Sequence, residues 1–75
     1  MAEVHTFTKN SREEVRISLD DFRGMRVVNL RVWFETQDGT MRPGKQGLAL
    51  RVEALPELLH GLHLVDAMTS GGGRA

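Results

Sequence analysis

The longest predicted strand of the chain is the alternating stretch Arg26-Val-Val-Asn-Leu-Arg-Val-Trp-Phe-Glu35. Apolar residues recur at every second position, which together with the β-branched residues is typical of a strand that buries one face. The predicted core face holds Val28, Leu30, Val32 and Phe34. The opposite face holds Val27, Asn29, Arg31, Trp33 and Glu35. A charged guanidinium therefore lies beside the only tryptophan of the chain.

Further strands are predicted on both sides of this stretch. Residues 14–19 alternate in the same way. Residues 4–8 alternate more weakly, which indicates a short edge strand. We expect the turn-forming residues Asp20-Asp-Phe-Arg-Gly24 to end the 14–19 strand. Asp38-Gly39 is a pair favoured in type I′ hairpin turns, so we expect a hairpin that returns near Met41.

The returning strand contains residues that disfavour a sheet. Residues 42–47 read Arg-Pro-Gly-Lys-Gln-Gly, and we expect them to interrupt the strand, because proline cannot donate to a ladder and glycine permits unusual backbone angles. Alternation resumes at residues 48–52. After Val52 the apolar period changes to three and four, which predicts an amphipathic helix. Several strands followed by one helix indicate an α+β fold with an antiparallel sheet.

Length and composition point to a partner subunit. The chain has 75 residues and no cysteine, so it is one domain that cannot be held together by disulfides or thiolate zinc sites. A domain this small buries only about 60 % of its unfolded surface. The leucines of the predicted helix also fit a spacing at which one stripe faces a second helix. We therefore expect an oligomer.

The formal net charge is zero, yet the charges are segregated along the chain. Residues 1–21 have a net charge of −2, residues 22–52 of +4 and residues 53–75 of −2. No apolar run approaches the ~20 residues that span a bilayer. The first residues lack the pattern of a secretory signal. We expect a soluble cytoplasmic protein, which could associate with the nucleoid.

The residues give little support to catalysis or metal binding. Asp20 and Asp21 are neighbours whose side chains point apart in a strand or turn, so we interpret them as a solvated turn. His60 and His63 have a spacing that can hold a metal, but only Asp66 is near enough to be a third ligand. We expect no enzyme activity, no metal and no cofactor.

The basic segment favours nucleic acid. Arg31 and Trp33 share one strand face, and proteins that bind single strands need cations for the phosphates and aromatic surfaces for the bases. Duplex readers usually insert a helix into the major groove, but the predicted helix is rich in leucine and nearly uncharged. From the residues alone a second interpretation stays open, in which the arginines only solubilise the strand and Trp33 caps the core.

Three stretches, 19–24, 28–34 and 38–50, resemble the transcriptional coactivator positive-cofactor-four family. Met41-Arg-Pro-Gly-Lys-Gln-Gly-Leu-Ala-Leu50 is the most specific of the matching residues. The resemblance implies a curved sheet of four antiparallel strands followed by one C-terminal helix (ββββα). It also implies a homodimer paired through its helices, with basic channels that bind single-stranded DNA largely without sequence preference.

The resemblance also implies roles for individual residues. Phe22 and Arg23 match an aromatic–basic pair in the first turn, and Arg31, Arg42 and Lys45 match basic residues. The stacking aromatic is Phe34 by ungapped alignment, but Trp33 by strand alternation, and we keep both with a slight preference for Trp33. Met25 and Gln46 stand where basic residues are common in the family, and Arg26 can replace the first of them. A long serine-rich acidic N-terminal region of eukaryotic members has no counterpart in this sequence.

These inferences combine into one hypothesis, a homodimeric, non-enzymatic protein that binds single-stranded DNA in transcription regulation, replication or repair. The alternatives are an RNA-binding protein that uses the same face, and a dimeric adaptor that contacts transcription or repair proteins. The predicted nucleic-acid contacts are Phe22, Arg23, Arg26, Arg31, Trp33, Phe34, Arg42 and Lys45. The predicted dimer interface is Leu55, Leu58, Leu59, Leu62 and Val65. We expect a domain at residues 13–68, an arm or edge strand at 1–12 and a disordered tail at 69–75.

Overall fold

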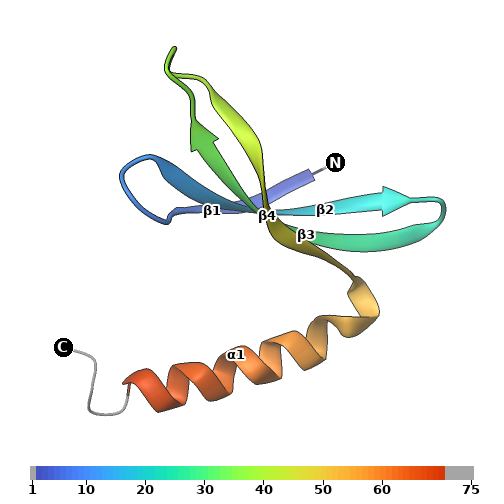
Figure 1. The fold of residues 1–75 in the computed structure, drawn as a ribbon. Helices are drawn as coiled ribbons and strands as arrows, with labels where there is room; N and C mark the ends of the chain where they lie inside the picture. The colour runs from blue at the N-terminus through green and yellow to red at the C-terminus, as the bar shows by residue number, and fades with distance from the viewer. Residues whose placement is uncertain (1, 71–75) are drawn as a thin grey trace.

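Four strands, each hydrogen-bonded to the next along the chain, form one antiparallel sheet in the computed structural model, which describes residues 2–70. The strands are β1 (Ala2–Thr8), β2 (Glu13–Phe22), β3 (Met25–Glu35) and β4 (Met41–Arg51). A short 3₁₀ helix, η1 (Val52–Ala54), leads into the helix α1 (Leu55–Ser70). The sheet is strongly twisted, and its hairpins point in different directions (Figure 1). The predicted α+β fold of four strands and one helix is confirmed.

The turn between β2 and β3 is tighter than the sequence predicted. β2 does not end at residue 19, because Asp20, Asp21 and Phe22 all pair with β3. Only Arg23 and Gly24 form the loop, and both have positive φ, at 54° and 81°. Positive φ at both central residues is the requirement of a type I′ turn. The type I′ turn therefore lies here and not at Asp38-Gly39.

The loop between β3 and β4 is longer and is organised by a carboxylate. Asp38 does not have positive φ, whereas Gly39 has φ of 87°, so the predicted type I′ turn is wrong. The Thr36 and Thr40 hydroxyls and the Thr40 N–H all donate hydrogen bonds to Asp38 Oδ1. The Gly39 N–H donates to Thr36 O at 3.0 Å. These bonds favour a wider loop, and they lower the pKa of Asp38 from 3.8 to about 2, the Thr36 bond contributing most.

β4 is continuous through the stretch that was expected to interrupt it. Pairing to β3 holds on both sides, as Trp33↔Pro43 and as Arg31↔Gly47. Between these pairs the register shifts, and residues 44–46 lie opposite Val32 alone. Proline and glycine are thus accommodated by a bulge instead of a break. The bulge bends β4 at the centre of its hairpin with β3.

The core is thinner than the alternation predicted, and Phe34 of the predicted core face is 38 % exposed. Ser18 on the opposite face is as buried as Val28, each with 8 % of its surface exposed. Val28 is the only apolar side chain in the described part with less than a tenth of its surface exposed, at 8 %. Its neighbours on the same face, Leu30 and Val32, remain half-buried. The protomer therefore leaves much of its apolar face without a covering layer.

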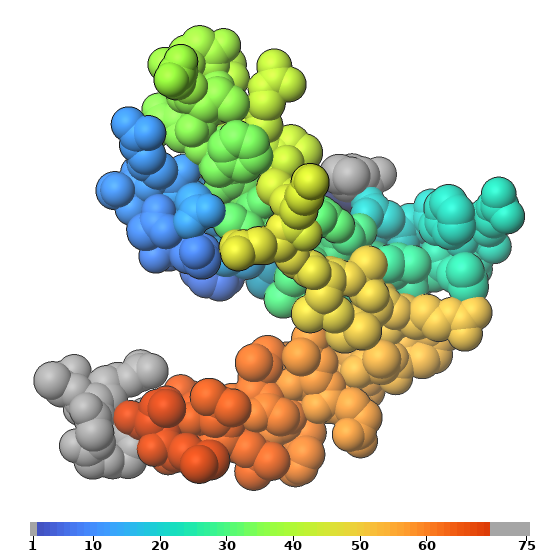
Figure 2. Space-filling view, viewed as in Figure 1, coloured from blue at the N-terminus to red at the C-terminus, as the bar shows by residue number. Residues whose placement is uncertain are grey.

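The helix stands apart from the sheet. α1 contacts η1 and makes few contacts with the strands. In the space-filling view it forms a separate arm joined to the sheet through η1 (Figure 2). It extends through Thr69 and Ser70, so the predicted start of a tail at residue 69 is wrong, while residues 71–75 lie outside the described part. Within residues 2–70, no helix is long and apolar enough to cross a bilayer.

Candidate nucleic-acid interface

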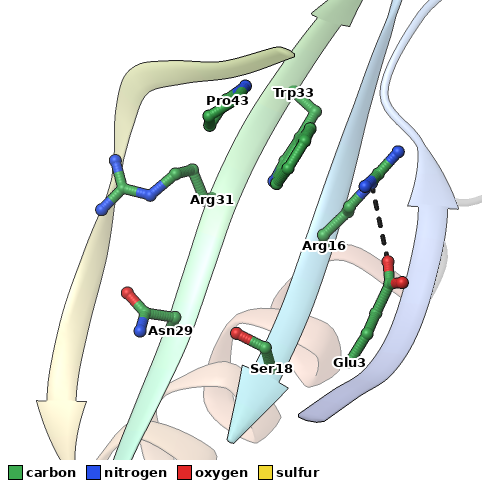
Figure 3. Close-up of a pocket in the computed structure, with 7 residues that line it drawn as sticks. All are labelled: Glu3, Arg16, Ser18, Asn29, Arg31, Trp33 and Pro43. Carbon is green, nitrogen blue, oxygen red and sulfur yellow. Dashed lines mark ion pairs between the residues drawn. The ribbon is translucent and has the colours of Figure 1, made fainter. Parts of the chain in front are cut away.

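Seven residues from all four strands surround one open hollow on the sheet face that carries Trp33 (Figure 3). The hollow has a volume of about 490 Å³. We call these residues the polar face: Glu3, Arg16, Ser18, Asn29, Arg31, Trp33 and Pro43. The strand register brings them together, because Arg16 pairs with Arg31, Ser18 with Asn29, and Trp33 with Pro43. In Figure 3, α1 lies behind the sheet, away from these side chains.

The indole of Trp33 carries a cation on one side. The guanidinium carbon of Arg16 lies 3.9 Å from the ring centroid, which is a close cation–π contact. Arg16 Nε also forms ion pairs with Glu14 of the same strand and with Glu3 of β1. The Arg16 charge is thus partly neutralised, whereas its planar guanidinium is fixed against the ring.

Arg31 is held by a backbone carbonyl. Its Nη1 donates a hydrogen bond to Gly44 O at 3.1 Å, across the bulge of β4. The bulge needs a close approach of the two backbones, since a Cβ at Gly47 would lie 2.5 Å from Leu30 O. No ion pair of Arg31 is found among residues 2–70. A carbonyl orients the guanidinium without offsetting its charge, so Arg31 presents a full positive charge to the hollow.

The polar face continues toward the β2–β3 hairpin. A second hollow is lined by Asp20, Asp21, Phe22, Val27 and Asn29, so it shares Asn29 with the first. The Asn29 amide donates to Asp20 Oδ2 at 2.6 Å. At the tip, Phe22 is 57 % exposed, and the Arg23 guanidinium lies 5.3 Å from its ring centroid. Phe22 pairs with Met25, so one aromatic–cation pair, Phe22 with Arg23, lies beside the start of β3. The other pair, Trp33 with Arg16, lies eight residues further along β3, which is about 26 Å of extended strand.

The remaining predicted contacts lie elsewhere. β2 and β3 pair without a register shift, so strand alternation places Phe34 on the face opposite Trp33. Arg42 pairs with Phe34 and belongs to that face, while Lys45 is exposed in the bulge.

Arg26 forms an exposed ion pair, with its Nε 3.8 Å from Oδ1 of Asp21. The structure therefore groups Arg31 with Trp33, and Phe22 with Arg23, but separates both pairs from Phe34 and Arg42.

Sequence reasoning missed Arg16 as a member of this site. Alternation already placed Arg16 on the outer face of the 14–19 strand. Its position beside Trp33 depends on the register of β2 against β3, which a local pattern does not contain. The same holds for Ser18, Asn29 and Pro43, which complete the hollow.

The predicted dimer interface lies along α1, away from the polar face. Leu55 and Leu58 are half-buried, whereas Leu59, Leu62 and Val65 are each at least 45 % exposed. Leu64 and Met68 add further exposed apolar surface. Among the described residues, no group of three or more His, Asp or Glu side chains could hold a metal ion.

Known proteins share this arrangement of strands and helix. A family model described as transcriptional coactivator p15 (PC4) matches residues 9–61. A PC4 homolog from Burkholderia pseudomallei K96243 is 31 % identical, with a TM-score of 0.77 over 85 % of this chain and 86 % of its own. A bacteriophage T5 homolog of PC4 is 18 % identical, with a TM-score of 0.72 over 91 % of this chain and 78 % of its own.

A third structure contains nucleic acid. MoSub1 in complex with single-stranded DNA is 22 % identical and has a TM-score of 0.65, over 100 % of this chain and 90 % of its own. No curated protein matches the chain. The T5 and MoSub1 likenesses establish the fold, while the family model and the Burkholderia homolog each extend over most of the sequence. On these two matches, the chain belongs to the transcriptional coactivator p15 (PC4) family.

Proposed function

We propose that this protein binds single-stranded DNA on the polar face, in a non-catalytic role in DNA transactions. The observation that carries the proposal is the grouping of Arg16, Arg31 and Trp33 around one open hollow. Arginine neutralises phosphates, and an indole offers a stacking surface that accepts any base. MoSub1, which shares the fold, has been solved with single-stranded DNA, and this supports the same ligand here.

A single strand fits this surface better than a duplex. The bases of a single strand are free to stack on Trp33 and Phe22, whereas those of a duplex are stacked on each other. The element that would have to enter a major groove is α1, and it contains no lysine or arginine. Its large exposed apolar side chains are Leu59, Leu62, Leu64, Val65 and Met68. The helix is thus suited to a protein partner.

We further propose that the partner of α1 is a second copy of the chain. The radius of gyration is 14.7 Å, against about 11 Å for a compact domain of this length. Exposed apolar residues of the helix and the thin core of the sheet are the surfaces that a second subunit would cover. A symmetric dimer would also present the polar face twice, which doubles the charge available to one strand.

Fluorescence anisotropy tests the nucleic-acid proposal. Labelled oligo-dT, a matched duplex and oligo-U RNA are titrated at several salt concentrations. Tightest binding to oligo-dT, weakened by salt, supports the proposal, whereas tighter binding to oligo-U would assign the same face to RNA. Arg31→Glu should strongly weaken binding, because Arg31 lines the hollow, whereas Arg42→Glu on the opposite face should have a smaller effect. If the wild type binds none of these nucleic acids, but the Arg31→Glu variant still loses the protein's function in cells, the protein acts instead as a protein adaptor.

A further inference from the structure

The N-terminal strand places an acidic side chain in the proposed binding face. Glu3 of β1 lines the hollow, and its Oε2 lies 3.5 Å from Arg16 Nε, as the dashed line in Figure 3 marks. A carboxylate that pairs with a cation in a site for phosphates weakens binding, because it neutralises that cation. Its presence needs an explanation in the geometry of β1.

A bulge in β1 directs Glu3 to this position. Glu3 pairs with Ser18 and His5 with Ile17, so Val4 has no partner in β2. In a regular strand, residues 3 and 6 would point to opposite faces. The extra residue brings both to the polar face, where the Thr6 hydroxyl donates to Glu3 Oε2 at 2.7 Å. Bulges next to functional sites re-aim side chains in this way.

Arg16 is arranged to bind an anion beyond its two carboxylates. Glu3 and Glu14 both approach Nε, and within the described part of the chain neither Nη group of Arg16 donates a hydrogen bond. Stacking on Trp33 uses the face of the guanidinium and leaves its edge available. The edge of a guanidinium matches two oxygens of a phosphate group.

The position of Arg16 opposite Arg31 adds a second reason. Like charges directly opposite on one sheet face destabilise each other unless an anion offsets them. In the free protein the carboxylates offset Arg16. When the nucleic acid displaces Glu3, a phosphate at the edge of the Arg16 guanidinium would take over this role.

From these contacts we infer that Arg16 is a phosphate-binding residue of the site, and that Glu3 is its internal competitor, displaced when the nucleic acid binds. The inference rests on the proposed function for the identity of the natural ligand. The ligand group at Arg16 itself is an anionic phosphate, with or without an attached base. Glu3 then sets how tightly the strand is held and how readily it is released.

The test compares Glu3→Gln, Arg16→Gln and the double variant with the wild type, using oligo-dT and inorganic polyphosphate. Glu53→Gln is the matched control, because it makes the same charge change at an exposed residue of η1. We expect Glu3→Gln to bind roughly two- to fivefold tighter than wild type. We expect Arg16→Gln to bind about tenfold weaker, with a salt slope reduced by about 0.7. Glu3→Gln should have no further effect when Arg16 is already replaced.

The outcomes distinguish the proposed function, binding of single-stranded DNA, from the inference about Glu3 and Arg16. A Glu3→Gln effect no larger than that of Glu53→Gln, or one that persists without Arg16, would overturn the inference while leaving the proposed function in place. Polyphosphate contains phosphates without bases. If polyphosphate gives the expected pattern and oligo-dT does not bind, the proposed function is wrong and the inference stands. If wild type binds neither, both are wrong.

Discussion

Arg16 lies over the indole of Trp33, with its guanidinium carbon 3.9 Å from the ring centroid. The two residues belong to adjacent strands and are brought together by the register of β2 and β3. One side of the indole is therefore occupied by a cation, and the other side is turned toward Arg31 and Pro43 (Figure 3). A base that stacks on Trp33 would enter between the indole and these two residues.

Replacing Trp33 should remove a stacking platform. We expect Trp33→Ala to weaken oligo-dT binding by about 1–3 kcal/mol, the usual contribution of one stacked base. Trp33→Phe keeps an aromatic ring and should recover part of this loss. Phe34→Ala is the control, since Phe34 lies on the opposite face. Anisotropy titrations measure all three, and a larger loss for Phe34→Ala than for Trp33→Ala would place the DNA on the other face.

Arg31 should contribute one phosphate contact. Each neutralised phosphate of a single strand lowers the slope of log affinity against log salt by about 0.7, because counterions are released. Arg31→Gln should therefore flatten this slope by about 0.7. Arg12→Gln makes the same charge change in the exposed β1–β2 turn and should leave the slope unchanged. Equal changes in the two variants would mean that only the total charge of the protein matters.

Two glycine-to-alanine substitutions should have opposite effects on stability. At Gly47 a Cβ would meet Leu30 O at 2.5 Å, and φ is 154°, so we expect Gly47→Ala to destabilise by about 1–3 kcal/mol. At Gly61 a Cβ meets nothing within 4 Å, so Gly61→Ala should stabilise α1 by up to about 1 kcal/mol. Urea denaturation at one protein concentration measures both. A neutral Gly47→Ala would show that the bulge does not require the close approach.

The β3–β4 loop should remain intact to unusually low pH. The hydroxyls of Thr36 and Thr40 hold the Asp38 pKa at about 2, below its ordinary value of 3.8. The folded chain thus gains stability above about pH 4 from the ionised carboxylate, and loses it as the pH falls toward 2. The stability difference between wild type and Asp38→Asn should shrink over this range. In an NMR titration, an Asp38 midpoint near 3.8 would contradict the geometry of the loop.

The exposed side of α1 should determine the oligomeric state. Leu62 is 49 % exposed in the protomer, so Leu62→Asp should cost the isolated subunit little while placing a charge in the proposed interface. We expect wild type to scatter light as twice 8.4 kDa and Leu62→Asp to approach 8.4 kDa. Circular dichroism checks that the sheet is retained. A folded variant with an unchanged mass would exclude the helix as the dimer interface.

The sequence predicted the faces of the strands better than their pairing. A period of two directly specifies which side chains share a face, so Arg31 and Trp33 could be placed together before the structure was known. Register depends on turn length, and the local residues predict a type I′ turn at Asp38-Gly39, whereas the structure has it at Arg23-Gly24. The Asp38 carboxylate accepts hydrogen bonds from the hydroxyls of Thr36 and Thr40, which stabilise a wider loop. Arg23 adopts a positive φ of 54°, which is unusual for a residue other than glycine. Arg16 was missed for the same reason.

The continuity of β4 could not be predicted from its local composition. Proline and two glycines within 42–47 suggested a break, but the ladder on either side holds the strand together and absorbs them as a bulge. The position of Glu3 was beyond prediction as well, because the bulge at Val4 reverses the face on which it lies. Such irregularities arise from pairing with a neighbouring strand and leave no periodic signal in the sequence.

An NMR titration of the side-chain N–H resonances with oligo-dT shows directly whether single-stranded DNA lies on the polar face. The chain has one tryptophan, so its indole N–H gives a single signal. We predict that this signal and the Nε–H signals of Arg16 and Arg31 shift together as the oligonucleotide is added. If these three stay unchanged while resonances of Arg42 or of α1 shift, the single strand binds elsewhere and the polar face is not the DNA-binding surface.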